Sequence, residues 1–220
     1  MKIGRFIRSS LSEWKGKNSC VIEVRGSALR SPFLSPIDLF EEDGPTINES
    51  EVLDFIAAGK SNLEAVSLNG GEPLLQKDLY QFLKKLKALK LPIILNTEGT
   101  CPDALDDMVG ACMVDKVCVK VCSSPDNVEQ FGPELRRSID ILSDSGIEYE
   151  VAIMAVPGIT DKQTVESICR LVKGKGQVSI VRFDITKSND PALKEFKKKE
   201  VLEFVASAKK FVKKVEVKGF

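Results

Sequence analysis

The feature that most constrains this chain is a regular alternation of short β-branched runs with longer amphipathic helical patterns. The runs that predict strands cover residues 20–25, 65–69, 92–96, 116–122, 148–155 and 178–184, with a short seventh at 215–218. The helical patterns between them cover residues 49–58, 78–90, 134–145, 161–173 and 191–213. Strands joined through single helices predict right-handed βαβ units and a parallel sheet. Six such units are too few for a closed eightfold barrel, so we expect an α/β fold with an open, partial (β/α)6 barrel.

Composition excludes several kinds of chemistry. The 220 residues include no histidine, which excludes imidazole acid–base catalysis, Ser-His-Asp triads and histidine metal ligands. The 32 basic and 32 acidic residues cancel, which removes the general electrostatic case for a nucleic-acid partner. The first residues predict no leader sequence, and no apolar run of about 20 residues occurs, so we expect no membrane partner. The expected location is the cytoplasm, where the six cysteines stay reduced.

A Gly-Gly-Glu-Pro turn, Gly70 to Pro73, follows the predicted strand 65–69. Glycine allows a ligand to approach the backbone closely, but it also suits a tight turn kept only for folding. Glu72 has two interpretations as well. It can bind an amine, or its carboxylate can stabilise the start of a helix.

This turn is one of several motifs that resemble the radical S-adenosylmethionine (SAM) superfamily, especially the activating enzymes of anaerobic ribonucleotide reductase and other glycyl-radical enzymes. The others, in order along the chain, are residues 6–17, 96–99, 145–150 and 156–158. The resemblance covers nearly the whole chain, so it implies one domain over residues 1–220. It also implies a vestigial SAM site, whose candidate residues are Gly70, Gly71, Glu72, Thr97 and Gly158.

The matching positions for the family's cluster ligands lie in the region 26–47. In the family, three cysteines of this loop hold a [4Fe-4S] cluster. Here the three positions carry Ser27, Ser31 and Leu34. A hydroxyl is a poor ligand for a soft metal site, and leucine is no ligand. We therefore expect a degenerate loop with no metal and no cofactor, SAM being an unfavoured alternative.

Strand alternation predicts further side chains inside the barrel. Cys118, Lys120 and Cys122 alternate with valines, so we expect the valines to face the helices and the other three to face the concave side. The two cysteines are roughly 13 Å apart on a strand, too far for one tetrahedral metal site. Alternation on the last long strand also favours inward-facing Arg182 and Asp184, either as an anion site or in a salt-bridge network with Glu98, Glu72 or Lys120. The predicted pocket-lining residues are Glu98, Cys118, Lys120, Cys122, Arg182 and Asp184.

Three functional hypotheses follow from the resemblance and its departures. The leading one is a catalytically inactive homologue that docks a protein partner as a structural or regulatory subunit. The second is a module that still binds SAM or a nucleotide-like ligand. The third is a glycyl-radical-type activating enzyme, or another enzyme with a non-standard site. The balance of these predictions leans against an enzyme.

Overall fold

One eight-stranded sheet runs through the computed structural model, which describes residues 1–59, 61–122, 125–173, 176–183 and 195–219, with the backbone alone for 125–131. The spatial order of the strands is their order in the chain, β1 to β8. β1 pairs antiparallel with β2, and every later neighbour pairs in parallel. The strands are β1 Ile3–Trp14, β2 Lys17–Val24, β3 Ala65–Gly70, β4 Ile93–Thr97, β5 Lys116–Val121, β6 Glu148–Ala155, β7 Gln177–Arg182 and β8 Val215–Lys218. This order confirms the predicted α/β half barrel.

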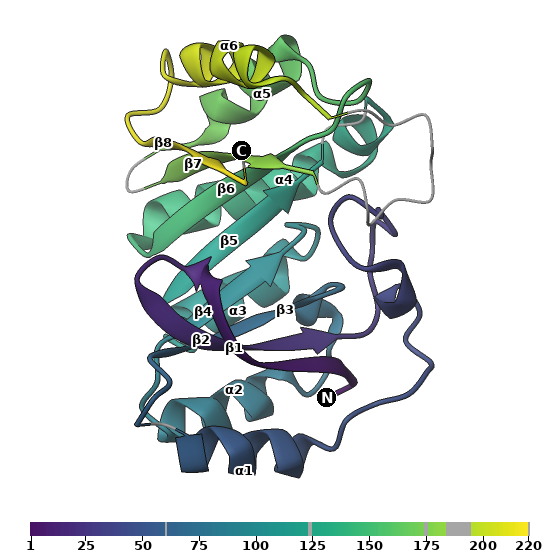
Figure 1. Ribbon diagram of the computed structural model, residues 1–220, viewed down its shortest axis with the longest axis vertical. Coiled ribbons are helices and arrows are strands. Elements are labelled where there is room, and N and C mark those ends of the chain that lie inside the picture. Colours follow the sequence, from purple (N-terminus) through teal and green to yellow (C-terminus); the bar gives the residue numbers. More distant parts are fainter. Residues whose placement is uncertain (60, 123–124, 174–175, 184–194, 220) are drawn as a thin grey trace.

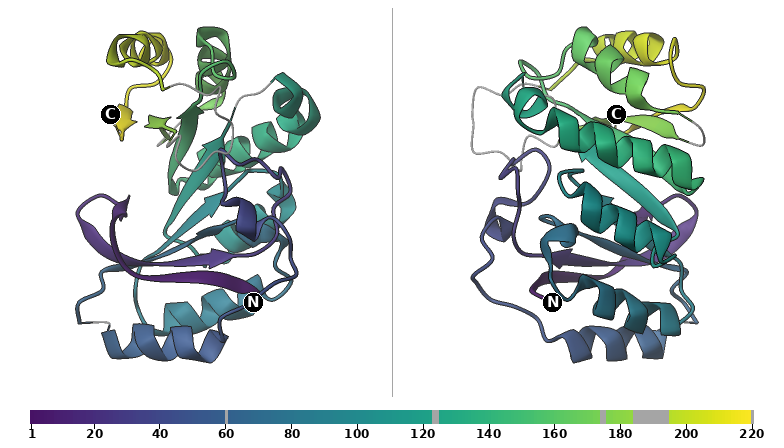
Figure 2. Two further views of the ribbon diagram at one scale, coloured as in Figure 1. Left: turned by 45° about the vertical axis from the view of Figure 1, so that its right-hand side comes forward. Right: turned by 180° about the vertical axis from the view of Figure 1, so that it is seen from behind.

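The helices cover one face of the curled sheet and leave the concave face open. They are α1 Glu49–Gly59, α2 Leu79–Ala88, α3 Pro102–Gly110, α4 Pro125–Ser145, α5 Lys162–Leu171 and α6 Lys198–Ala208. In Figure 2 (right) several of them lie in front of the sheet, whereas in Figure 1 the β1–β2 hairpin curls across the opposite face. No helix in the described ranges has the length and hydropathy needed to cross a membrane.

The two faces of β5 show why the sheet has this shape. Val117, Val119 and Val121 belong to the large apolar core beneath the helices. Cys118, between them, packs instead with Ile94 and Ala152 on the concave face. Successive side chains of a strand point to opposite faces, so this alternation gives one apolar face for the helices and a mixed face for the barrel interior.

Sequence patterns missed β1 and α3. Ile3–Trp14 is rich in serine and charged residues rather than in β-branched ones, and its pairing with β2 is interrupted by register shifts. Pro102–Gly110 is only 9 residues long. Such elements depend on tertiary pairing more than on local propensity. α6 begins at Lys198, later than the predicted start, and residues 191–194 of that prediction lie outside the described ranges.

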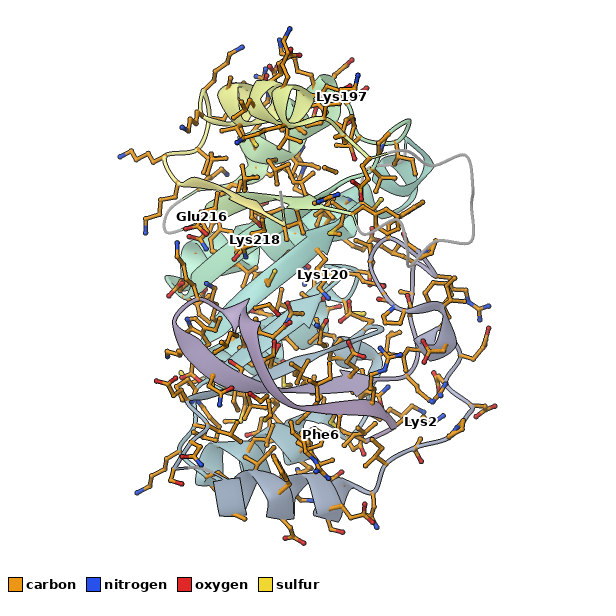
Figure 3. All side chains as sticks on the ribbon, in the orientation of Figure 1. Lys2, Phe6, Lys120, Lys197, Glu216 and Lys218 are labelled. Carbon is orange, nitrogen blue, oxygen red and sulfur yellow. The ribbon has the colours of Figure 1, made fainter. Side chains whose placement is uncertain are left out.

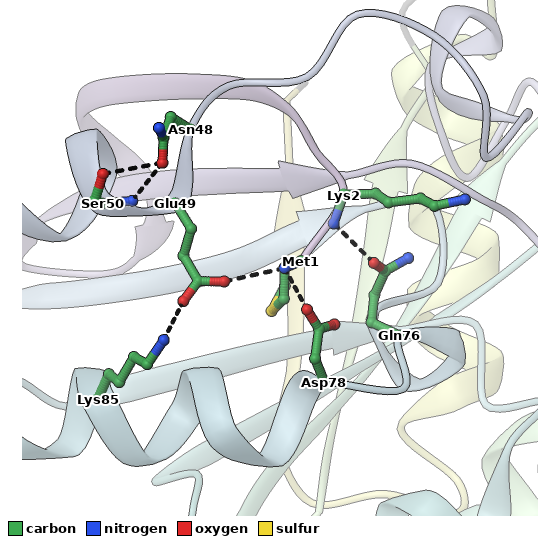
Figure 4. A network of polar contacts seen from close by, with 8 residues as sticks. All are labelled: Met1, Lys2, Asn48, Glu49, Ser50, Gln76, Asp78 and Lys85. Atoms are coloured by element: carbon green, nitrogen blue, oxygen red, sulfur yellow. Dashed lines mark hydrogen bonds and ion pairs between the residues drawn. The ribbon is translucent and has the colours of Figure 1, made fainter.

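Polar contacts join the first residues of the chain to α1 and α2 (Figure 4). The amino group of Met1 donates to Glu49 Oε2 at 3.0 Å and also to the carboxylate of Asp78. Asn48, directly before α1, accepts a hydrogen bond from the backbone N–H of Ser50 at 3.0 Å. These contacts hold the start of β1 beside the helices that flank it.

Candidate functional site at the mouth of the half barrel

The Gly-Gly-Glu-Pro turn lies at the carboxyl end of β3 and packs directly on the end of β2. Gly71 N–H donates to Val24 O at 3.0 Å, and Glu72 N–H donates to Gly26 O at 2.7 Å. A Cβ added to Gly71 would lie 1.8 Å from Gly26 O, and one on Gly70 would lie 2.4 Å from Val24 N. Gly70 also has φ +107°, a region that favours glycine. Both glycines are therefore required by the close approach of two backbones, which is the structural reading of the turn.

Glu72 is fully buried and joins three parts of the mouth. Its Oε1 accepts from Leu74 N–H at 3.0 Å, while its Oε2 accepts from Thr97 Oγ1 at 2.8 Å and from Glu98 N–H at 2.7 Å. Burial, and then the negative charge of Glu98, raise the pKa of Glu72 to about 7. The carboxyl is thus half ionised near neutral pH, although it accepts three hydrogen bonds.

Glu98 holds the loop that follows β2. Its Oε1 accepts from Ser27 Oγ at 2.7 Å and from Ser35 Oγ at 3.3 Å, and its Oε2 accepts from Leu29 N–H at 3.2 Å. Ser27 is one of the three predicted cluster-ligand positions, so its hydroxyl is engaged with a carboxylate. Within the described residues, the hydrogen-bond partners of both Glu98 and Glu72 are hydroxyls and backbone N–H groups rather than cations.

Apolar side chains fill the part of the mouth beyond β5, β6 and β7. The cluster contains Leu34, Cys122, Val156 and Phe183, with Leu29, Phe33, Met154 and Ile159 packed against it. Phe33 meets Phe183 edge to face, with ring centroids 5.0 Å apart. Burial raises the pKa of Cys122 to about 12, against the opposing effect of a hydrogen bond with Ser31, so this thiol stays protonated at neutral pH.

The concave face carries the other predicted pocket residues. Cys118 packs with Ile94 and Ala152, and Trp14 from the β1–β2 hairpin packs against them. Burial, and then the charge of Glu150, raise the pKa of Cys118 to about 12. Lys120 is half-buried and donates to the side-chain oxygen of Asn69 (Figure 3). Cys118 and Cys122 belong to separate apolar clusters, so the structure does not bring the two thiols together.

A third buried carboxylate, Glu150, lies on the concave face near the amino ends of β5 to β7. It accepts from the ammonium group of Lys218 and from Gln177 Nε2, and Lys116 Nζ lies 3.9 Å from its Oε2. Burial acts to raise the pKa of Glu150, but Lys218 and its other partners outweigh burial and lower it. A basin of about 540 Å³ beside it is lined by Trp14, Lys116 and Lys218 among others. Figure 3 shows Lys218 and Glu216 at this edge.

The prediction for Arg182 was wrong. Val181, one residue earlier, packs against the concave cluster, whereas Arg182 contacts the carboxylate of Glu195 and donates to Gly219 O at 3.3 Å. Alternation predicted which residues share a face, but only the packing showed which of the two sets faces inward. Asp184 lies outside the described residues. Gly158 lies in the turn after β6 with φ +82°, and a Cβ there would meet no atom within 4 Å.

Sequence reasoning missed how the loop after β2 closes the mouth. It treated Ser27, Ser31 and Leu34 as lost positions, whereas Leu34 is 6% exposed and packed in the mouth. The available signal was the apolar content of residues 29–34, where Leu29, Phe33 and Leu34 lie close together in the sequence.

The comparisons with known proteins agree with this architecture. The sequence model of the radical SAM superfamily matches residues 36–172, which is more than half of the chain. The chain therefore belongs to the radical SAM superfamily.

Among individual relatives, a Methanocaldococcus jannaschii protein with the provisional name of glycyl-radical enzyme activating enzyme is 24% identical, over 95% of this chain and 92% of its own. A GTP 3′,8-cyclase of Helicobacter pylori is 22% identical over 81% of this chain and 58% of its own. A radical SAM methyltransferase from Sphaerobacter thermophilus superposes with a TM-score of 0.72 at 12% identity, over 93% of this chain and 67% of that one. The last likeness concerns the fold.

These findings correct two predictions. The hypothesis of a catalytically inactive homologue is contradicted by the family match and by the near full-length similarity to an activating enzyme, which support the activating-enzyme alternative better. The prediction of no cofactor is overturned on the same grounds, because members of the radical SAM family normally bind SAM and a [4Fe-4S] cluster. Members of this family are generally enzymes, so the balance no longer leans against one.

The side chains at the mouth fit these two groups differently. Glu72 and Glu98 are buried carboxylates without a described cationic partner, and SAM carries a sulfonium and an ammonium. The loop positions Ser27, Ser31 and Leu34 supply no thiolate. Among the described residues, no set of three or more His, Cys, Asp and Glu side chains is arranged to hold a metal ion. The two carboxylates therefore match the cationic groups of SAM in charge, whereas Ser27, Ser31 and Leu34 do not fit a [4Fe-4S] cluster.

Proposed function

We propose that this chain is an activating-enzyme-type member of the radical SAM superfamily that binds SAM at the mouth of the half barrel. The observation that carries the proposal is the pair of buried carboxylates, Glu72 and Glu98, that have hydroxyl and backbone partners but no described cation. A buried charge is costly unless it is paired. A cationic ligand would supply the missing partner.

The position of these carboxylates also supports the proposal. Both follow parallel strands at their carboxyl ends, which is where α/β folds place their ligands. Thr97 orients Glu72 through the hydrogen bond to Oε2. Lys120, which donates to an amide oxygen, offers a positive charge for the carboxylate of the ligand. Bound SAM supplies an activated sulfonium, whose carbon–sulfur bonds are the reactive ones.

The class of partner in this proposal is a protein. The relative from M. jannaschii is named for the activation of a glycyl-radical enzyme, and its similarity to this chain is nearly full-length on both sides. We accordingly propose an enzyme that acts on a protein, in the cytoplasm, through a non-standard site.

Isothermal titration with SAM tests the proposal. The wild type should bind SAM, and the substitution Glu98→Gln should weaken binding at least tenfold because it removes one charge but keeps an acceptor for Ser27. Glu203→Gln, an exposed acid of α6, is the matched control and should bind as the wild type does.

S-adenosylhomocysteine, which lacks the sulfonium charge, should bind more weakly than SAM. Equal binding of the two ligands would indicate a nucleoside site rather than a cation site. The absence of binding at millimolar SAM, or unchanged binding in Glu98→Gln, would refute the proposal.

A further inference from the structure

The loop after β2 places a short segment over the two carboxylates. We call residues 27–35 the plug segment. Its apolar side chains Leu29, Phe33 and Leu34 pack with Cys122, Val156 and Phe183 at the carboxyl ends of β5, β6 and β7. The segment therefore spans the mouth, from the end of β2 to the far side of the barrel.

The plug segment lacks the ladder of hydrogen bonds that fixes a strand. Leu34 and Ser35 donate their N–H groups to Ser31 O, within the segment itself. Arg30 donates to Ser27 Oγ and has φ +47°, an uncommon conformation for a residue other than glycine. The segment is held to the barrel by the apolar cluster and by the carboxylate of Glu98, which accepts from Leu29 N–H. Ser27 N–H also donates to Phe40 O at 3.2 Å, and Arg30 pairs with Glu41 in the following part of the same loop.

The carboxylates lie under this segment. Glu72 is 0% exposed and Glu98 is 3% exposed. One cavity, of about 360 Å³, lies on the outer side of the segment at Ser27, Arg30 and Glu41, and the basin at Lys116 lies further along the concave face. Neither of these cavities is lined by Glu72 or Glu98. A ligand of the size of SAM has no open path to the carboxylates through either one.

We propose that the plug segment is a movable closure of the SAM site, which must leave the mouth before the ligand reaches Glu72 and Glu98. The inference rests on the proposed function, and it adds a conformational step to binding. A ligand that binds only the open state has its apparent affinity reduced by the fraction of molecules that are open. Weakening the closed state therefore strengthens binding.

Leu34→Ala and Ser27→Ala test the closure by weakening, in turn, the apolar contact and the hydrogen bond to Glu98 that hold the plug segment. Leu34→Ala removes packing from the mouth, and Ser27→Ala removes one hydrogen bond to Glu98 while keeping its charge. Each should bind SAM at least threefold more tightly than the wild type. Each should also exchange the amide hydrogens of residues 29–35 at least tenfold faster without ligand. Leu202→Ala, at a 54% exposed position of α6, is the control and should change neither quantity.

Saturating SAM should speed amide exchange in the plug segment of the wild type, because the ligand displaces it. Binding of SAM with slower exchange in this segment, or tighter binding in neither variant, overturns the closure while the proposed function stands. If the wild type and both variants all fail to bind SAM, the proposed function itself fails. Circular dichroism of each variant verifies that the fold is intact.

Discussion

Buried carboxylates lie at two places on the same sheet, and their electrostatic surroundings are opposite. At the mouth, Glu72 and Glu98 face each other's charge with hydroxyls and N–H groups as partners, and the pKa of Glu72 rises to about 7. Near the amino ends of β5 to β7, Glu150 is equally inaccessible but has Lys218 and Lys116 beside it, and its pKa is lowered. Burial acts in the same direction at both places, so the presence of cations decides the outcome.

The comparison shows which of the two places lacks a compensating positive charge among the described residues. The amino-end network neutralises itself, which suits a structural role. The mouth has acidic groups without a described cation, and buried polar groups of this kind concentrate at functional sites.

Gly71→Ala should cause the largest loss. The new Cβ would lie 1.8 Å from Gly26 O, an impossible contact with backbone that must be relieved by moving the turn away from β2. We expect a loss of about 4 kcal/mol or more in the free energy of unfolding, measured by urea denaturation. Gly110→Ala in α3, where a Cβ meets nothing within 4 Å, is the control and should be neutral or slightly stabilising. Equal effects at both glycines would contradict the close packing of the turn.

The pH dependence of stability should reveal Glu72. Its pKa is raised from 4.5 in the unfolded chain to about 7 in the folded protein. The folded state therefore keeps its proton where the unfolded state has lost it. Between these two pH values the free energy of unfolding should fall by roughly 3 kcal/mol as pH rises, and level off above about pH 7.

Urea denaturation of the wild type and Glu72→Gln between pH 5 and 7.5 isolates this contribution. The variant should lack the fall, although it is less stable throughout because an amide cannot accept all three hydrogen bonds. Carboxyl groups whose pKa is lowered, such as that of Glu150, titrate below this pH range. Parallel pH profiles for the two proteins would show that Glu72 keeps an ordinary pKa.

Glu150→Gln should destabilise the amino-end network by about 2 kcal/mol, because Lys116 and Lys218 lose a charged partner in a largely buried place. The loss should be present at neutral pH and vanish in acid, since the pKa of Glu150 is lowered and its ionised form stabilises the folded state. Glu148→Gln, whose side chain is 54% exposed, serves as the comparison and should lose less than about 1 kcal/mol. A loss that persisted at low pH would point to packing rather than charge.

Glu216→Gln should have the smallest effect. Glu216 pairs with Lys15 at 3.3 Å, across the opening between β8 and the β1–β2 hairpin, but the Lys15 side chain is 88% exposed. Exposed pairs of this kind contribute below about 0.5 kcal/mol in most cases. Thermal unfolding of the wild type and the variant at low and high salt measures the contribution of this ion pair to stability. A large, salt-dependent loss would mean that this pair holds the barrel edge together.

Much of the fold could be predicted from the sequence. The predicted strands 148–155 and 215–218 coincide with β6 and β8, and the predicted start of α1 at residue 49 is correct. Runs of β-branched residues and the helical period carry this information locally. β1 could not be found in this way, because its polar residues become a strand only through pairing with β2.

The site was predictable to a lesser degree. The order of short motifs along the chain indicated the Gly-Gly-Glu-Pro turn and the family that it resembles. The alternation in β5 predicted that Cys118 and Lys120 lie on the concave face. The prediction that Arg182 of β7 faces inward was wrong, because alternation alone does not tell which of the two sets of side chains faces the concave side. The raised pKa of Glu72 depends on burial and on the charge of Glu98, 26 residues away, and neither is visible in a local pattern.

The sequence alone was enough to predict the alternating strands and helices other than β1 and α3, the parallel part of the sheet and the position of the glycine turn, because these follow from short-range periodicity and backbone sterics. Three features came from tertiary packing instead. The loop after β2 folds over the mouth, Glu98 holds it there, and Glu150 is paired with lysines whereas Glu72 has no described cation beside it. These outcomes depend on contacts between residues far apart in the chain, because electrostatic interactions and burial are set by distances in space rather than by sequence order.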